Sequence, residues 1–66
     1  MISITKCEKI VDGLSVTENE SEKLKEYVTL EIFRAQVERD LRQVCTDEEI
    51  CARVEINRRL AEIRTR

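Results

Sequence analysis

The stretch Thr46-Asp47-Glu48-Glu49-Ile50 carries the strongest local structural signal in the chain. Thr46 can cap the free N–H groups of a new helix, and Glu49, three residues on, can reach back to it. The acidic side chains between them suit the positive end of the helix dipole, and the apolar Ile50 follows directly. The stretch therefore predicts a tight turn followed by a helix over about residues 47–64.

The segment upstream of this turn favours a second helix. Residues 21–45 contain no Gly or Pro and are rich in Glu, Lys, Leu, Arg and Gln, which are good helix formers. One long helix over about residues 21–45 is the simplest prediction, with Thr17 and Glu20, or Ser21 alone, capping its start. The β-branched and aromatic run at residues 27–33 would also suit a strand, but the length and the continuing period favour a helix. Together the two helices would form an antiparallel hairpin over residues 17–66.

Residues 1–16 admit two predictions. Apolar residues recur at spacings of three and four, which favours a short helix ended by Gly13; they are Ile4, Cys7, Val11 and Leu14. Asp12-Gly13 between two apolar pairs is also a good two-residue hairpin turn, so an extended segment is the alternative. In either form, this segment is expected to cover part of the hairpin.

The composition indicates a single small all-α domain over residues 1–66. Hydrophobic residues make up 41% of the chain and charged residues 39%, with one Gly and no Pro. A domain of this size buries only about 60% of the surface that its unfolded chain exposes, so we expect a disulfide, a metal or an oligomer to add stability. The formal net charge of −2 provides no global positive field for nucleic acid or anionic lipid. No apolar window is long enough to span a bilayer and the opening residues do not resemble a secretory signal, which predicts a cytoplasmic protein.

Both predicted helices carry two apolar stripes, although a hairpin hides only one stripe of each. On the first helix, a core seam falls within about 80° of the helical wheel; its members are Leu30, Phe33, Val37, Leu41 and Val44, with Tyr27 and Cys45 at the edge. A second sector lies nearly opposite and contains Leu24, Val28, Ile32 and Ala35. On the second helix, one stripe contains Ile50, Val54 and Ala61, and another contains Ala52, Ile56, Leu60 and Ile63.

The surplus stripes predict a protein contact, most simply a homodimer or higher homo-oligomer that completes a helical bundle. The candidate interface residues are Leu24, Val28, Ile32, Ile50, Val54 and Asn57. Asn57 interrupts the stripe of Ile50, Val54 and Ala61, where a polar residue can fix register by pairing with its counterpart, or can simply be exposed at an edge. The alternative is a monomeric bundle in which residues 1–16 cover both remaining stripes. The function that these stripes predict is a non-catalytic interaction module: a small regulator, adaptor or inhibitor that occupies a surface.

The chain contains few of the residue types that catalysis, metal binding or cofactor binding usually requires. The chain has no His, the commonest general base and metal ligand, and a single Gly, where phosphate-binding loops need several. Cys7, Cys45 and Cys51 are expected to be reduced, small apolar groups, and Cys45 and Cys51 lack the spacing of a zinc or redox site. Cys45 lies before a predicted helix start, but the carboxylates there would oppose a thiolate. We therefore predict no enzyme activity, cofactor, metal or small-molecule substrate.

Nucleic-acid binding in a dimer is the alternative function. It would use the arginines of the second helix, which are Arg53, Arg58, Arg59, Arg64 and Arg66. On the wheel these side chains scatter around the helix and alternate with Glu55 and Glu62, and they form no single basic stripe. Two aromatic residues, Tyr27 and Phe33, are too few for a base-stacking platform. The alternative is therefore less favoured than a protein contact.

Overall fold

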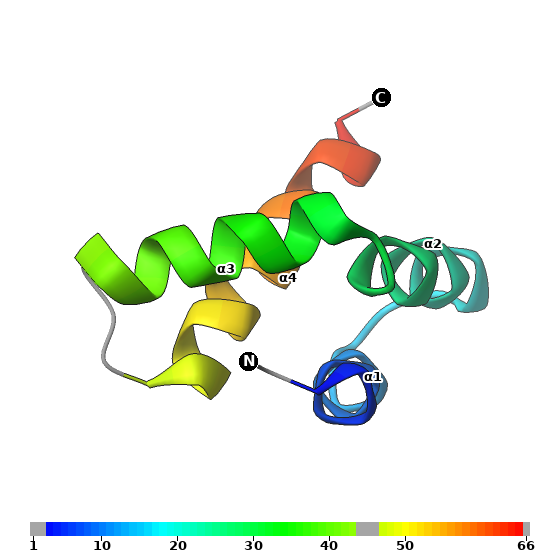
Figure 1. Cartoon of the computed structure of the whole chain (residues 1–66). Helices are drawn as coiled ribbons and strands as arrows, with labels where there is room; N and C mark the ends of the chain where they lie inside the picture. The colour runs from blue at the N-terminus through cyan, green and yellow to red at the C-terminus, as the bar shows by residue number, and fades with distance from the viewer. Residues whose placement is uncertain (1–2, 44–46, 66) are drawn as a thin grey trace.

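The computed structural model describes residues 3–43 and 47–65, and within these ranges the chain consists of helices and connecting turns (Figure 1). The helices are α1 (Ile4–Asp12), α2 (Glu18–Val28), α3 (Glu31–Gln43) and α4 (Glu48–Arg64). This arrangement confirms the predicted all-α class. The alternative of a strand around residues 27–33 is wrong, because α2 and α3 occupy that segment.

Polar side chains cap the starts of three helices. Ser3 accepts a hydrogen bond from the backbone N–H of Lys6 at the start of α1. Thr17 and Glu20 form the predicted reciprocal capping box at the start of α2. At the start of α4 the cap is Asp47, whose Oδ1 accepts from the N–H groups of Glu49 and Ile50 at 2.8 and 3.4 Å. The helix thus begins one residue later than predicted, and Thr46 lies outside the described residues.

The largest difference from the prediction is a break in the expected helix over residues 21–45. The helix stops at Val28, and Thr29 donates from its hydroxyl to the carbonyl of Glu26 at 2.7 Å. The backbone N–H of Leu30 then bonds to the carbonyl of Tyr27, which closes a turn before α3 begins at Glu31. A Thr hydroxyl that bonds a nearby backbone carbonyl competes with the backbone hydrogen bonds of the helix, so the helix can end here without Gly or Pro.

The break has a packing reason. Leu24 and Val28 lie nearly opposite Phe33 and Val37 on the wheel of one straight helix, so such a helix could not turn all four toward one core. In the structure, α2 and α3 point in different directions, and all four side chains are buried in the same cluster. Because the helix is split, a single core covers both apolar sectors, and no second surface is needed to bury them.

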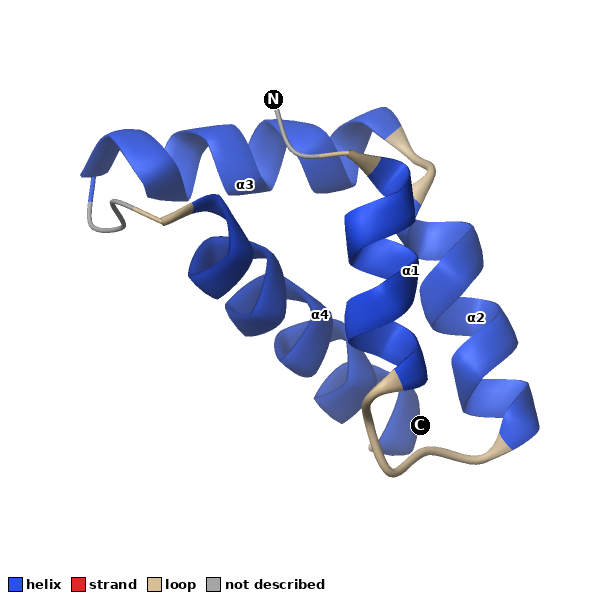
Figure 2. Ribbon diagram, turned by 90° about the horizontal axis from the view of Figure 1, so that it is seen from below, coloured by secondary structure: helices blue, strands red, loops and turns tan. Residues whose placement is uncertain are grey.

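The N-terminal segment adopts the helical alternative. α1 ends at Gly13, whose backbone N–H returns to the carbonyls of Lys9 and Ile10, so Asp12-Gly13 does not form a hairpin turn. α1 buries Cys7, Ile10 and Val11. It lies beside α2 in both views and also contacts α4 (Figures 1 and 2). An ion pair of 2.7 Å between Lys25 and Asp12 ties α1 to α2.

α4 is the helix that organises the core. It contacts each of the other three helices and runs back across α3 obliquely (Figure 2). Its contribution to the core comes from four apolar residues: Cys51, Ala52, Ile56 and Leu60. In the part of the chain that the structure describes, no helix is long and apolar enough to cross a membrane.

Candidate interaction surface

α4 carries two apolar stripes, of which one packs in the core and the other is exposed to solvent. We call Ala52, Ile56, Leu60 and Ile63 the inner stripe, because they lie in the core or pack against it. We call Ile50, Val54, Asn57 and Ala61 the outer stripe, because all four are exposed. Ile50 and Val54 keep 56% and 54% of their surface in contact with solvent. The side of α4 away from the core therefore displays a line of apolar side chains.

The presence of Asn57 explains why the outer stripe, and not the inner stripe, faces solvent. Burying a carboxamide without hydrogen-bond partners costs a few kcal/mol, so the stripe that contains Asn57 is the more expensive one to bury. In the structure the Asn57 side chain is exposed and has no hydrogen-bond partner among residues 3–43 and 47–65. The inner stripe contains no such group and also has the larger side chains.

The structure divides the predicted interface residues between core and surface. Leu24 and Val28 are fully buried within the chain, so they are no longer candidates for an interface with a partner. Their burial follows from the break after Val28, which turns this stripe of α2 toward the core. Ile32 is 58% exposed on α3 and joins the outer-stripe residues as surface. Leu30, predicted in the core seam, is instead 47% exposed at the turn.

The remaining residues of that predicted seam are buried or lie outside the description. Phe33 and Val37 are buried as predicted. The side chains of Leu41 and Val44, together with Cys45, are not described. The seam is therefore confirmed only for the middle of α3.

A buried carboxylate on α4 went unrecognised in the sequence. Glu55 is 2% exposed, and its Oε2 accepts from the Tyr27 hydroxyl at 3.0 Å and from Arg58 Nη2 at 2.6 Å. Burial, followed by the hydrogen bond to Glu55, raises the pKa of Tyr27. A signal was present, because Glu55 lies between Cys51 and Ile56 on the wheel, on the side that is buried.

A surface cleft of about 360 Å³ lies beside this network. It is lined by side chains from α2, the following turn and α4: Lys23, Glu26, Tyr27, Leu30, Arg59 and Ile63. The guanidinium carbon of Arg59 lies 5.0 Å from the centre of the Tyr27 ring, which also meets the Phe33 ring edge-on at 5.4 Å. The cleft therefore mixes apolar, cationic and acidic groups.

The arginines of α4 do not form an unpaired basic patch. Four of the five candidate nucleic-acid contacts each pair with a carboxylate: Arg53 with Glu49, Arg58 with Glu55, Arg59 with Glu62 and Arg64 with Glu20. Arg66 lies outside the described residues. Paired guanidiniums attract phosphates less than free ones, because a neighbouring carboxylate offsets their charge.

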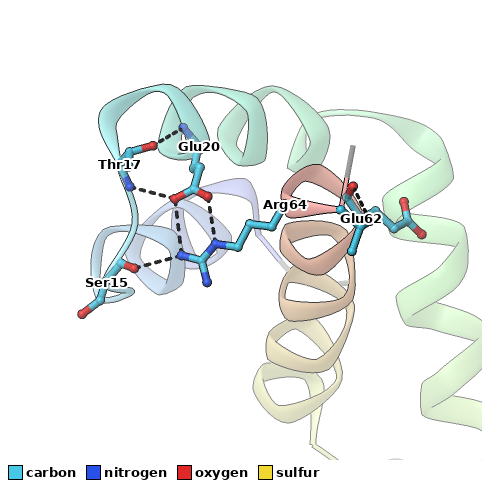
Figure 3. Close-up of polar contacts among 6 residues, drawn as sticks. Ser15, Thr17, Glu20, Glu62 and Arg64 are labelled. Carbon is cyan, nitrogen blue, oxygen red and sulfur yellow. Dashed lines mark hydrogen bonds and ion pairs between the residues drawn. The ribbon is translucent and has the colours of Figure 1, made fainter.

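The Arg64–Glu20 pair fastens the end of α4 to the start of α2 (Figure 3). Arg64 donates from Nε to Glu20 Oε2 at 2.8 Å and from Nη2 to Oε1 at 3.3 Å, and Nη2 also reaches the carbonyl of Ser15. These hydrogen bonds, with the backbone N–H of Thr17, lower the pKa of Glu20 to about 2. A bidentate geometry of this kind fixes orientation as well as distance.

The cysteines that the structure describes are buried thiols. Cys7 and Cys51 lie in the core, and burial raises the pKa of Cys7. Cys45, the thiol nearest the start of α4, falls outside the described ranges. Within those ranges, no group of three or more His, Cys, Asp or Glu residues is placed to hold a metal ion.

Comparison of the chain with models of known protein families, with curated proteins and with solved structures finds no match.

Proposed function

We propose that this protein is a non-catalytic interaction module that acts by occupying a surface, as a small regulator, adaptor or inhibitor, and that it self-associates through the outer stripe of α4. The observation that carries the proposal is the exposure of Ile50 and Val54 on a helix whose inner stripe lies in the core or packs against it. Apolar side chains that lie in line along one helix are typical of a helix that packs against another helix.

The outer stripe is preferred over Ile32 for a geometric reason. Its members lie at successive positions along one face of a 17-residue helix, where a partner helix can contact all of them at once. Ile32 is equally exposed but stands on α3, with polar or small residues next to it along the same face, including Ala35 and Arg39. Ile32 therefore makes a matched control for the outer stripe.

The association is expected to be weak. Covering the exposed half of Ile50 or Val54 contributes about 1 kcal/mol, and a symmetric dimer covers four such side chains. This contribution is modest beside the cost of bringing two molecules together. Measurements of mass must therefore extend to about 1 mM, where an association free energy of about 4 kcal/mol gives half occupancy.

Sedimentation velocity over a concentration series up to about 1 mM tests the proposal on three chains: the wild type, Val54→Lys and Ile32→Lys. We expect the wild type and Ile32→Lys to gain mass with concentration, and Val54→Lys to stay at the monomer mass of 7.8 kDa with its helix content retained. A monomeric wild type at the highest concentration would exclude self-association. Loss of association in Ile32→Lys alone would move the surface to α3 and overturn the proposal.

Nucleic-acid contact through Arg53, Arg58, Arg59, Arg64 and Arg66 stays an alternative that draws no support from the ion pairs of α4. It is separated from the proposal by DNA binding measured at several salt concentrations, since affinity for phosphates falls steeply with salt. We expect no binding to mixed-sequence DNA even at low ionic strength.

A further inference from the structure

We infer that two copies of the chain pair their α4 helices antiparallel, with the two-fold axis passing at Asn57. This inference rests on the proposed function and specifies its partner, a second copy, together with the direction and register of the contact. Three observations carry it: the charge distribution along α4, the position of Asn57, and the spacing of the apolar residues around it.

The charge of α4 changes sign along its length. Outside the buried Glu55, residues 47–56 carry three carboxylates and one guanidinium, for a net charge of −2. Residues 57–65 carry three guanidiniums and one carboxylate, for a net charge of +2, which the ion pair of Arg64 with Glu20 of α2 reduces to +1. The acidic end includes Asp47 and Glu49, and the basic end includes Arg64. The helix dipole has the opposite sense, positive at its start, which each of these charges complements.

The length of α4 makes the direction of pairing matter. Its 17 residues span about 25 Å, whereas charges in physiological salt are screened beyond about 8 Å. Each end of the helix therefore responds mainly to whatever lies directly across from it. Parallel pairing would place the acidic half against the acidic half and the basic half against the basic half. Antiparallel pairing places opposite charges together at both ends and also opposes the two helix dipoles.

Asn57 defines where the axis passes. A carboxamide carries both a donor and an acceptor, so two copies of Asn57 that meet on a two-fold axis can bond each other reciprocally. The Asn57 side chain has no hydrogen-bond partner in the described part of the chain, so it is available for this contact. A single Asn in an apolar seam is known to select one register, because any shift buries it against apolar groups.

The same axis matches the apolar residues on either side of it. Val54 lies three residues before Asn57 and Ala61 lies four residues after it, so each Val54 faces the partner's Ala61 with an offset of about 1.5 Å along the helix. A β-branched side chain thus meets a small one, which lets the two helices approach closely. Ile50 then lies over the last turn of the partner's α4.

Disulfide cross-linking of variants that each carry one introduced surface cysteine tests both direction and register. The background carries Cys45→Ser, while the buried Cys7 and Cys51 stay in place. In an antiparallel pair centred on Asn57, an Asn57→Cys chain meets itself, whereas two copies of Ala61→Cys are about 12 Å apart along the axis and two copies of Ile50→Cys about 21 Å. A disulfide needs Cα atoms closer than about 7 Å.

We therefore expect Asn57→Cys to form covalent dimers in a mild redox buffer, and Ala61→Cys and Ile50→Cys to form almost none. An equimolar mixture of Val54→Cys and Ala61→Cys should form the mixed dimer in preference to either homodimer. Self-linking of Ile50→Cys and Ala61→Cys would demonstrate parallel pairing and overturn the inference. Absence of every cross-link overturns it too, and sedimentation then shows whether the dimer itself is missing, in which case the proposed function also fails.

Discussion

The two faces of α4 are similar in sequence, but one is buried in the core and the other is exposed to solvent. Each face is apolar, and each is interrupted by one polar residue: Glu55 on the buried side and Asn57 on the exposed side. Glu55 receives hydrogen bonds from Tyr27 and Arg58 within the same chain, whereas Asn57 receives none from the described residues. The hydrogen bonds of the buried face are therefore made within the chain, whereas the exposed face leaves its apolar side chains and Asn57 to solvent.

The largest expected difference between the two faces is in stability. Ile56 is fully buried, so Ile56→Ala should lower the free energy of unfolding by about 2–5 kcal/mol, through lost burial and the cavity that it leaves. Ile50→Ala, on the exposed face, should change the monomer's free energy of unfolding by no more than about 0.5 kcal/mol. Urea denaturation at low protein concentration, followed by circular dichroism, measures both. Equal losses in the two variants would mean that the outer stripe is also packed within the chain.

A smaller effect is expected from the polar group of the buried face. Tyr27→Phe keeps the ring contacts with Phe33 and Arg59 but removes the hydroxyl that bonds Glu55. Leaving the buried carboxylate with one donor fewer should cost about 1–3 kcal/mol. Thr65→Val removes an exposed hydroxyl at the end of the same helix and serves as the control, with an expected change within about 0.5 kcal/mol. If Tyr27→Phe is no more costly than this control, the buried network does not stabilise the fold.

The smallest effect is expected at the rim, where Arg64 joins α4 to Glu20. Because the pKa of Glu20 is lowered to about 2, its ionised form favours the folded state. This contribution is fully present above the ordinary carboxylate pKa near 4.5 and is lost as the pH falls through about 2. Acid unfolding of the wild type and Glu20→Gln should show a stability gap at pH 6 that closes toward pH 2. A gap of constant size would show that the charge of Glu20 is not its cause.

Sequence periodicity was informative wherever one helix faces one core. It predicted the burial of Phe33 and Val37, while the capping residues located the helix that begins near Asp47 and the capping box of Thr17 and Glu20. The start of α4 was misplaced by one residue because Thr46 and Asp47 are both good caps, and only the backbone geometry chooses between them.

Periodicity failed where tertiary packing overrode local preference. The break after Val28 joins two stripes that a straight helix would hold apart, and Thr29 gives only a weak signal for it. On a helix without that break, Leu24 and Val28 lie on a stripe that the predicted hairpin does not cover. The same limit hid the role of Glu55, since a wheel shows the side on which a carboxylate lies but not the Tyr27 hydroxyl that meets it from α2.

The contrast between the two faces is tested most directly by NMR chemical shifts of side chains as the protein is diluted from about 1 mM, the concentration at which a weak dimer is half formed. We predict shifts that change with concentration at Ile50, Val54 and Ala61 and at the Asn57 side-chain amide, while Ile56 and Leu60 of the inner stripe stay constant. Constant shifts along the whole outer stripe, or changes confined to Ile32 on α3, would contradict the claim that the exposed face of α4 is a contact surface.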